Sequence, residues 1–434
     1  MGSSARLAAP AVLGWGMLRH LLPALPLVTG ALVWQDAITI AAGPGEKGPW
    51  RQNDSRYDYV DDATVAFVPG GGLLLSWVDQ RSKDVWVRPV DAAGSAGKNL
   101  NVSRSPATFS WHPRIAVDPG RPGRVYLLWQ EIIFSGGSHG GDILFAASND
   151  GGRSFAAPLN LSRSEGGDGK GRLSREVWSN GSLDLAAGAD GSIVAAWTEY
   201  HGALWTARSS NAGASFSAPH RVAGDDARPA RAPALAAGPG AAFHLAWTVG
   251  EDPAARIRVA HSSDGGVRFG APQLVDAGAG RADAPDLAVD GTGRLHLVFA
   301  QHGARAQVRY TSMAADSGSF DPVRTLSGAQ AAAYPTLASD GRDGLAVLWE
   351  HLGSGGRGQS LGFALSRDGG RRFSNPAVVP GSNAPAGGSN GSQQGLLGRK
   401  LALDEAGRIA VVNSSLAPKK GSRVWLMRLL PNYP

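Results

Sequence analysis

The sequence contains no cysteine among its 434 residues. This absence excludes disulfide bonds, thiolate nucleophiles and zinc sites that use cysteine ligands. Aromatic residues are also few, at 7%, and no segment of the body repeats apolar residues with the period of a long amphipathic helix. A helical or disulfide-stabilised architecture is therefore not expected. The 60 glycines and 27 prolines instead favour many short strands that are joined by turns.

The chain is basic overall but has no basic block. Its 42 Lys and Arg against 36 Asp and Glu give a net charge of +6, and these residues are scattered along the sequence. Nucleic-acid binding requires clustered cations, so we expect no nucleic-acid partner. Four histidines, His112, His201, His302 and His351, fall in different parts of the chain and lack the spacing of metal ligands. We therefore expect neither a metal site nor a cofactor.

An apolar segment near the N-terminus, Leu21 to Trp34, is only 14 residues long and contains two prolines. It is too short and too interrupted for a membrane-spanning helix, but it follows a basic pair and has the apolar core of a secretory signal. Met17 is an alternative start, and cleavage is expected after Ala31, with an uncleaved anchor as the alternative. We predict an exported protein, periplasmic or extracellular, with residues 1–35 as signal or membrane-targeting segment and residues 36–434 as one domain.

Four stretches share the pattern Ser-x-Asp/Asn-x-Gly-x-x-Phe, namely 148–155, 209–216, 262–269 and 366–373. The side chain at the third position, in Asp150, Asn211, Asp264 and Asp368, is suited to accept hydrogen bonds from backbone N–H groups shortly after it. The glycine permits a positive φ, and the closing phenylalanine is expected to pack the turn onto a sheet. Because the four copies look interchangeable, we assign these residues to turn structure rather than to catalysis.

A longer element repeats seven times along the chain. Each copy has two apolar segments around a glycine-rich turn, and the copies begin at Ala63, Pro113, Leu183, Pro233, Pro285, Pro335 and Arg399. In most copies a third strand, the Asp turn and a short fourth strand follow. Four antiparallel strands in a unit of roughly 40 to 70 residues are typical of a β-propeller blade. The sequence thus predicts an all-β, seven-bladed β-propeller of four-stranded antiparallel sheets, with six blades as the alternative.

The last unit ends after RVWLMRLLP and lacks an outer strand. We predict that DAITIAAG, Asp36 to Gly43, fills this place from the other end of the chain. Such a closure removes two exposed sheet edges.

Together the Asp turns and the four-stranded units resemble the Asp-box, or BNR, repeats of the sialidase superfamily, and the resemblance covers Asp36 to the end of the chain. Enzymes of this family cleave terminal sialic acids with retention. They use a tyrosine nucleophile paired with a glutamate, an aspartate as acid/base, and three arginines that hold the substrate carboxylate. A neutral phenol suits this substrate because an anionic sugar repels a carboxylate nucleophile, and guanidinium groups bind a carboxylate in a bidentate manner.

The segment AYPTLASDGRDGLAVLWE, Ala333 to Glu350, is similar to the last blade of that family. The resemblance implies that Tyr334 is the nucleophile and that Glu350, at the end of the second strand, is the catalytic-site glutamate that steadies one of the family's arginines. It places Arg305 where the third clamp arginine is expected. Asp84 is the candidate acid/base, with Glu131 as a second candidate.

Other family positions are not matched. The residues at 61–63 are Asp-Asp-Ala where the family has Arg-Ile-Pro, and Ala232 stands where a glutamate partner is expected. Seven units also differ from the six blades of the family. A propeller that binds without cleaving is therefore kept as the alternative function.

The position of Tyr334 varies between units, where its counterparts are Asp62, His112, Ser182, Ala232, Ala284 and Arg399. Variation of this kind is typical of a binding face. Further polar and aromatic residues at strand ends are expected on the same face: Asp79, Arg81, Trp111, His112, Glu131, Arg175, Trp178, Glu199, Tyr200, His201, Arg228, Arg231, His302 and His351. The predicted substrate-binding set comprises Arg305, Arg81, Glu131, Trp111, His112, Glu199, Tyr200 and Arg231.

The sequence predicts an exported, sialidase-like propeller that recognises a terminal or acidic sugar and hydrolyses it if Tyr334 acts as nucleophile. The alternative is a non-catalytic propeller that binds a protein or a glycan in the cell envelope. The expected partner is accordingly a glycan or glycoconjugate, or an envelope protein, and a monomer is expected.

Overall fold

The computed structural model describes residues 1, 33–49, 51, 54–105, 108–135, 138–163, 183–199, 202–225, 227–250, 254–385, 388–390 and 399–430. The chain divides into Met1–Leu32 and Val33–Pro434, and the fold below is that of the second unit. Apart from Met1 and the stretch from Val33 on, the predicted leader lies outside the described residues. No helix among the described residues is long and apolar enough to cross a membrane.

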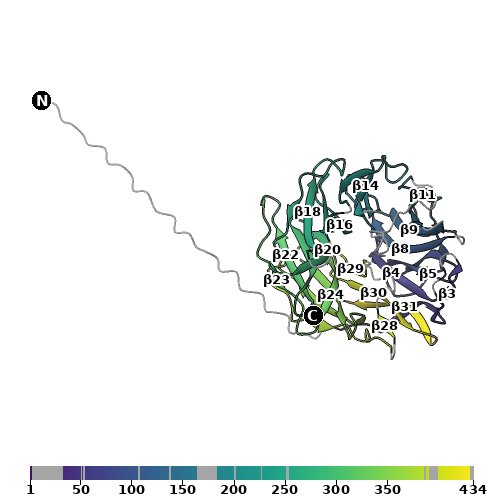
Figure 1. The fold of residues 1–434 in the computed structure, drawn as a ribbon. Coiled ribbons are helices and arrows are strands. Elements are labelled where there is room, and N and C mark those ends of the chain that lie inside the picture. Colours follow the sequence, from purple (N-terminus) through teal and green to yellow (C-terminus); the bar gives the residue numbers. More distant parts are fainter. Residues whose placement is uncertain are drawn as a thin grey trace. The chain divides into compact units, whose positions relative to one another are not determined.

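Seven antiparallel sheets form the seven blades of a β-propeller, as predicted (Figure 1). The inner strands of consecutive blades contact one another all the way round, and the inner strand of the last blade contacts that of the first. The strands of blades 1 to 3 are β4 (Val60–Phe67), β5 (Leu73–Asp79), β6 (Asp84–Val90) and β7 (Leu100–Asn101); β8 (Phe109–Val117), β9 (Val125–Ser135), β10 (Ser138–Ser148) and β11 (Leu159–Asn160); and β12 (Leu183–Ala187), β13 (Ile193–Thr198), β14 (Leu204–Ser209) and β15 (His220–Ala223).

Blades 4 to 7 follow the same order from the centre outward. Their strands are β16 (Ala230–Ala237), β17 (Phe243–Val249), β18 (Arg256–Ser262) and β19 (Gln273–Leu274); β20 (Arg281–Val289), β21 (Leu295–His302), β22 (Gln307–Met313) and β23 (Arg324–Thr325); β24 (Ala332–Ser339), β25 (Leu345–Leu352), β26 (Gly358–Ser366) and β27 (Ala377–Val378); and β29 (Leu401–Leu403), β30 (Ile409–Ala417), β31 (Gly421–Leu429) and β1 (Ile38–Gly43). A short strand β28 (Ser389–Asn390) also pairs with β30.

The apolar core is a series of layers between neighbouring blades. The second strand of each blade is buried on both faces, as β13 illustrates, in which every residue is buried. One layer joins Leu74 and Val87 of blade 1 to Ile115 and Leu127 of blade 2. Burial on both sides explains why these strands read as continuous apolar runs rather than as alternating ones.

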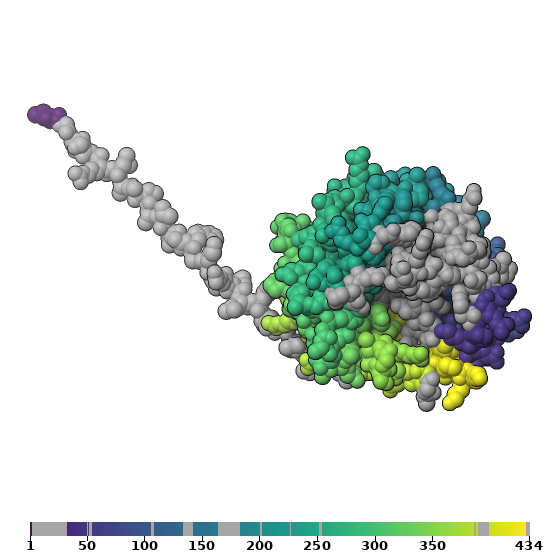
Figure 2. Space-filling model, in the orientation of Figure 1, coloured from purple at the N-terminus to yellow at the C-terminus, as the bar shows by residue number. Residues whose placement is uncertain are grey.

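The ring is closed by a strand from the opposite end of the chain, which confirms the predicted closure. β1 pairs with β31 in an antiparallel register that sets Ile38 opposite Leu426 and Ala42 opposite Arg423. Ile40 is only 2% exposed and packs in the same cluster as Val424. Figure 2 shows the first part of the propeller, in dark purple, beside the C-terminal strands, in yellow, at the surface.

The Asp turns lie between the third and fourth strands and fasten each blade to the one before it. In the first copy, Asp150 Oδ1 accepts hydrogen bonds from Ser148 Oγ at 2.8 Å and from the backbone N–H of Arg153 and Ser154 at 2.9 Å. Gly152 has φ 85°, and a Cβ there would lie 2.6 Å from a methyl group of Leu74 in the preceding blade. A side chain at this glycine is therefore excluded both by the backbone conformation and by the neighbouring blade.

The other three copies repeat this geometry. The oxygen of the third residue, in Asn211, Asp264 and Asp368, accepts a backbone hydrogen bond four residues later at 2.9 to 3.0 Å. Burial alone would raise the pKa of Asp150, but the hydrogen bonds from Ser154 and Ser148 outweigh it and lower the pKa to about 2. These side chains act as turn-forming groups at the outer part of the blades.

The first strand of five blades contains a β-bulge. The bulged residues, Asp62, His112, Ala232, Ala284 and Tyr334, all have a left-handed backbone with φ between 51° and 55°. The pairing register shifts at each of them, for example between Ala333 and Thr336. A bulge redirects a side chain relative to the strand, and a left-handed residue that is not glycine marks a conformation held by its surroundings. The sequence alignment also set Ser182 and Arg399 at this position, but Ser182 lies outside the described residues and Arg399 is not left-handed.

Candidate functional site

One face of the ring carries the start of the first strand and the end of the second strand of every blade. The pairing of Val60 with Asp79 in blade 1 and of Ala332 with His351 in blade 6 shows this arrangement. We call this face the upper face. The bulged residues lie just inside it, on the strands that line the central channel.

Tyr334 is the centre of a cluster of charged side chains from blades 4, 5 and 6. Burial raises the pKa of the Tyr334 phenol, the negative charges of Glu350 and Asp283 raise it further, and the guanidinium groups of Arg281 and Arg231 lower it. The phenol is partly buried and stays protonated near neutral pH. Two cations and two anions from neighbouring inner strands thus act on a neutral phenol at the upper ends of these strands.

A chain of side-chain hydrogen bonds within blade 5 joins Arg281, Asp283 and His302. Arg281 Nε donates to Asp283 Oδ2 at 2.9 Å, and His302 Nε2 lies 3.0 Å from Asp283 Oδ1. Burial would raise the pKa of Asp283, but the hydrogen bond from His302 and the charges of His302, Arg281 and Arg231 lower it. Asp283 is therefore an ionised carboxylate that positions the Arg281 guanidinium and the His302 ring.

Glu350 lies at the end of β25 and forms an ion pair with Lys400 of blade 7, in which Lys400 Nζ contacts Glu350 Oε1. Both residues are buried, at 7% and 6% exposure. Arg231 in blade 4 donates from Nε to the Gly250 carbonyl at 3.3 Å. The cluster thus draws on four consecutive blades, 4 to 7.

A second charged layer occupies the inner strands just beyond the bulges. Arg399 donates from one terminal nitrogen to Asp184 Oδ2 and to the Leu235 carbonyl, both at 2.8 Å. The backbone N–H of Leu235 also donates to Asp184 Oδ2, at 2.7 Å. Asp286 Oδ2 accepts hydrogen bonds from Thr336 Oγ1 and from the N–H of Leu337.

Arg114 belongs to the same layer. Burial lowers its pKa, whereas the nearby charges of Asp184 and Asp62 raise it. Burial would also lower the pKa of Arg399, but Asp184 and Asp286 raise it. The layer therefore holds cations and anions in compensating positions and connects the inner strands of opposite parts of the ring.

Trp111 and His112 were expected on the binding face, but the structure buries both side chains in the wall, at 2% and 1% exposure. Burial lowers the pKa of His112 to about 4, although the charge of Asp62 opposes this, with Oδ2 3.5 Å from His112 Nδ1. His112 is thus a neutral core histidine at pH 7. The bulge itself explains the difference, because it turns this residue toward the neighbouring blade instead of the solvent.

Three predicted carboxylates are engaged in local hydrogen bonds. Asp84 accepts hydrogen bonds from Asn101 Nδ2 and Ser103 Oγ at 2.7 Å, and from the N–H of Ser105 at 2.8 Å. Glu131 accepts one from the indole of Trp129 at 3.0 Å, and Glu199 accepts the equivalent bond from Trp197 at 2.9 Å. These contacts hold strand ends in place, and none of them involves the Tyr334 cluster.

The arginines of the predicted set lie at different places on the upper face. Arg305 lies in the exposed turn between β21 and β22, whereas Arg231 and Arg281 are the arginines that act on Tyr334. Arg81 is exposed and lies 3.9 Å from Asp58 in blade 1. Arg175, Trp178, Tyr200 and His201 lie outside the described residues.

Sequence reasoning missed Arg281, Asp283 and Lys400. The first two precede the bulged Ala284 by three residues and one residue, so their position next to a bulge is the signal that identifies them. Lys400 directly precedes the inner strand β29 and has no such signal. His351, which was expected on this face, is buried and hydrogen-bonds Ser360 Oγ at 3.2 Å. Among the described residues, no group of three or more His, Asp or Glu side chains is arranged to hold a metal ion.

No known protein-family model matches the sequence, and no curated protein does either. Solved structures match at the level of the fold. A polysaccharide lyase described as an ulvan lyase bound to -[GlcA(1-4)Rha3S]- superposes with a TM-score of 0.53 at 11% identity, covering 84% of this chain and 94% of its own. The α-L-arabinanase of Penicillium chrysogenum, complexed with arabinobiose, gives 0.50 at 14% identity, covering 77% and 98%.

A sialidase from Trypanosoma rangeli also matches, with a TM-score of 0.47 at 10% identity, covering 90% of this chain and 59% of its own. The likeness to the first two structures shows that the chain has the β-propeller fold found among these proteins.

Proposed function

We propose that the protein recognises an acidic sugar at the mouth of the channel and cleaves its glycosidic bond. The observation that carries this proposal is that Tyr334 occupies a left-handed bulge on β24, beside β20 with its hydrogen-bonded Arg281 and Asp283, and that the charges of Glu350, Asp283, Arg281 and Arg231 act on the pKa of its phenol. The two arginines supply the cations that a sugar carboxylate requires. Tyr334 then attacks the anomeric carbon while Glu350 takes the phenolic proton, and the bond from that carbon to the aglycone oxygen breaks, with this oxygen taking a proton from solvent water. A second water then attacks the anomeric carbon, the bond to Tyr334 breaks, and the phenol and Glu350 return to their starting protonation states.

The neighbouring folds support this assignment at the level of substrate class. The ulvan lyase is bound to a polymer that contains glucuronic acid, and the arabinanase is complexed with a disaccharide. We therefore propose that the protein acts on carbohydrates, as these propellers do. Its export, which the N-terminal segment predicts, is part of the proposal.

The test uses the purified protein with fluorogenic glycosides. We expect turnover of a 4-methylumbelliferyl α-sialoside or β-glucuronide, and no turnover of the neutral β-galactoside. Tyr334→Phe removes the nucleophile and is expected to lower kcat by about 10²-fold or more, without loss of binding in calorimetry. Arg231→Gln and Arg281→Gln are expected to raise KM for the acidic glycoside.

Tyr310→Phe is the matched control, because Tyr310 lies in the layer between blades 5 and 6 and hydrogen-bonds His296 Nδ1 at 2.8 Å. It removes a tyrosine hydroxyl far from the proposed chemistry and should leave kcat unchanged. Equal turnover by wild-type protein and Tyr334→Phe would overturn the nucleophile assignment.

A second candidate function is glycan binding without cleavage. It is favoured by the ion pair with Lys400, which engages the Glu350 oxygen, and by the three hydrogen bonds that occupy Asp84. This function predicts that wild-type protein binds acidic oligosaccharides but turns over none of the fluorogenic glycosides. Retained affinity in Tyr334→Phe and lost affinity in Arg231→Gln would then identify a binding protein.

A further inference from the structure

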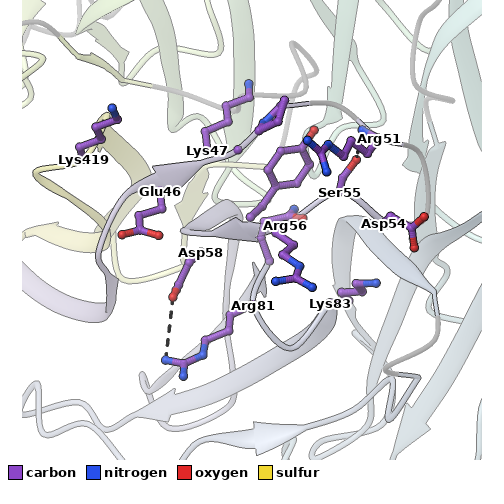
Figure 3. A pocket seen from close by; sticks show the side chains of 14 residues that line it. Glu46, Lys47, Arg51, Asp54, Ser55, Arg56, Asp58, Arg81, Lys83 and Lys419 are labelled. Atoms are coloured by element: carbon purple, nitrogen blue, oxygen red, sulfur yellow. Dashed lines mark hydrogen bonds and ion pairs between the residues drawn. The ribbon is translucent and has the colours of Figure 1, made fainter.

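A second polar pocket, of about 1280 Å³, opens over blades 7 and 1. Its walls come from a hairpin that the sequence analysis did not foresee, β2 (Glu46–Lys47) paired with β3 (Tyr57–Asp58), from the β5–β6 turn, and from Lys419 in the β30–β31 turn (Figure 3). Both turns follow the second strand of their blades. The pocket therefore lies on the upper face, as the Tyr334 cluster does, but over different blades.

The pocket is rich in cations. Six basic side chains line it, namely Lys47, Arg51, Arg56, Arg81, Lys83 and Lys419. Three acidic side chains accompany them, Glu46, Asp54 and Asp58, so the lining carries a net charge of plus three. The one ion pair drawn within it, between Arg81 and Asp58, has a separation of 3.9 Å and an Arg81 side chain that is 78% exposed (Figure 3). An anionic ligand can therefore compete for these cations.

Backbone hydrogen bonds hold the described part of the hairpin together and join it to blade 7. Gly48 N donates to the Arg56 carbonyl at 3.2 Å, and Lys419 N donates to the Gly45 carbonyl at 2.9 Å, which ties the hairpin to blade 7. Lys83 and Lys419 both have left-handed backbones, with φ 62° and 61°. Lysines in this conformation are uncommon, and such residues concentrate at ligand sites.

The mixture of charges distinguishes between classes of anionic ligand. Nucleic-acid backbones carry a charge at every nucleotide and would meet Glu46, Asp54 and Asp58 as well as the cations. Among the described residues of the lining, the single aromatic ring is that of Tyr57, which is 9% exposed and so presents little surface for base stacking. A glycan with spaced carboxylate or sulfate groups fits better, because its hydroxyl groups donate to the carboxylates while its anions contact the Lys and Arg side chains.

We propose that this pocket binds a segment of an anionic polysaccharide that bears carboxylate or sulfate groups. The site goes beyond the proposed function, because it lies over other blades and requires no chemistry at Tyr334. It extends the ligand from one terminal sugar to a chain that contacts the upper face at two places.

The probes are sulfated dextran and oligogalacturonate, with neutral dextran as the comparison, and binding is measured by calorimetry at two salt concentrations. The wild-type protein is expected to bind both anionic glycans, more weakly at higher salt, and not the neutral one. The triple variant Lys47→Ser, Arg56→Ser, Lys419→Ser removes three exposed cations and is expected to weaken binding by about tenfold or more. Thermal unfolding checks that this variant folds.

The matched control is the triple variant Arg268→Ser, Arg367→Ser, Arg372→Ser. These arginines are exposed and lie at Asp turns, on the opposite face, so the control changes the net charge equally without touching the pocket. Equal weakening in both triple variants, no weakening in the pocket variant, or no binding by the wild type would overturn the proposal. Tighter binding of duplex DNA or of phosphatidylserine vesicles than of the anionic glycans would overturn it in favour of those ligands.

The proposed cleavage at Tyr334 and the proposed binding at the pocket can be tested independently. Turnover of a small fluorogenic glycoside is expected to be unchanged in the pocket variant, and polysaccharide binding at the pocket is expected to persist in Tyr334→Phe. Loss of polysaccharide binding in Tyr334→Phe would contradict an independent pocket.

Discussion

Charged side chains in this propeller have two different roles. The aspartates of the Asp turns accept backbone and hydroxyl hydrogen bonds within one turn, as Asp150 does. The charged residues near Tyr334, such as Asp283 and Glu350, instead form ion pairs with other charged side chains. A carboxylate bonded to its own turn supports the fold, whereas one that holds a cation near a hydroxyl can support chemistry.

The turn-forming role of the aspartates can be tested at Asp150. Asp150→Ala removes the acceptor for four hydrogen bonds and is expected to lower the free energy of unfolding by about 1 to 2 kcal/mol, since the turn is solvent-exposed. Asp150→Asn keeps the oxygen that Asn211 uses in the second copy, so it should cost less than half as much. The measurement is the urea midpoint of each variant, and an Asp150→Ala midpoint equal to that of the wild type would contradict this role.

The stability difference between wild type and Asp150→Asn is also expected to depend on pH. The pKa of Asp150 is about 2 in the folded protein, below its ordinary value of 3.8. A lowered pKa stabilises the folded state above pH 4 and loses this effect as the pH falls through 2. The stability difference between wild type and Asp150→Asn should therefore shrink as the pH falls from 4 to 2, and a constant difference would show that the charge contributes nothing.

At the level of strands, the closing element β1 joins the first residues of the propeller to its last blade. Ile40→Ala is expected to destabilise the protein by about 2 to 4 kcal/mol, because a residue that is 2% exposed leaves a cavity between β31 and blade 1. Thr39→Ala, next to it on the exposed face of β1, is the matched control and should cost little. Equal urea midpoints for the two variants would mean that the closure does not stabilise the ring.

The strands also show what the sequence could predict and what it could not. Hairpin spacing and apolar runs were sufficient for seven blades and for the strand that closes them, because each depends on local patterns. The side chains around Tyr334 were not predictable in the same way, because a bulge shifts the register by one residue. Tyr334 and Glu350 were found by resemblance, whereas Arg281 and Asp283 approach Tyr334 only because two bulged strands stand side by side.

For the molecule as a whole, the charged layer beyond the bulges connects blades that are far apart in the sequence. Arg399 in blade 7 bonds to Asp184 in blade 3 and to the carbonyl of Leu235 in blade 4. The charges of Arg114 and Asp286 lie in the same layer. The layer holds compensated charges, so it links the inner strands of distant blades in addition to the apolar layers between neighbours.

This link predicts a coupling between two variants. Arg399→Met leaves Asp184 buried without its cation and is expected to cost about 2 to 3 kcal/mol, and Asp184→Leu leaves the guanidinium unpaired at a similar cost. The double variant should cost clearly less than the sum, with a coupling of about 1 kcal/mol or more, because it removes both charges together. Arg294 and Asp321 form a surface pair of the same length, 2.8 Å, and their cycle is expected to give less than about 1 kcal/mol. If urea unfolding gave additive losses of free energy for the Arg399 and Asp184 variants, the two charges would not stabilise each other. The apolar layers between neighbouring blades alone would then hold the ring together.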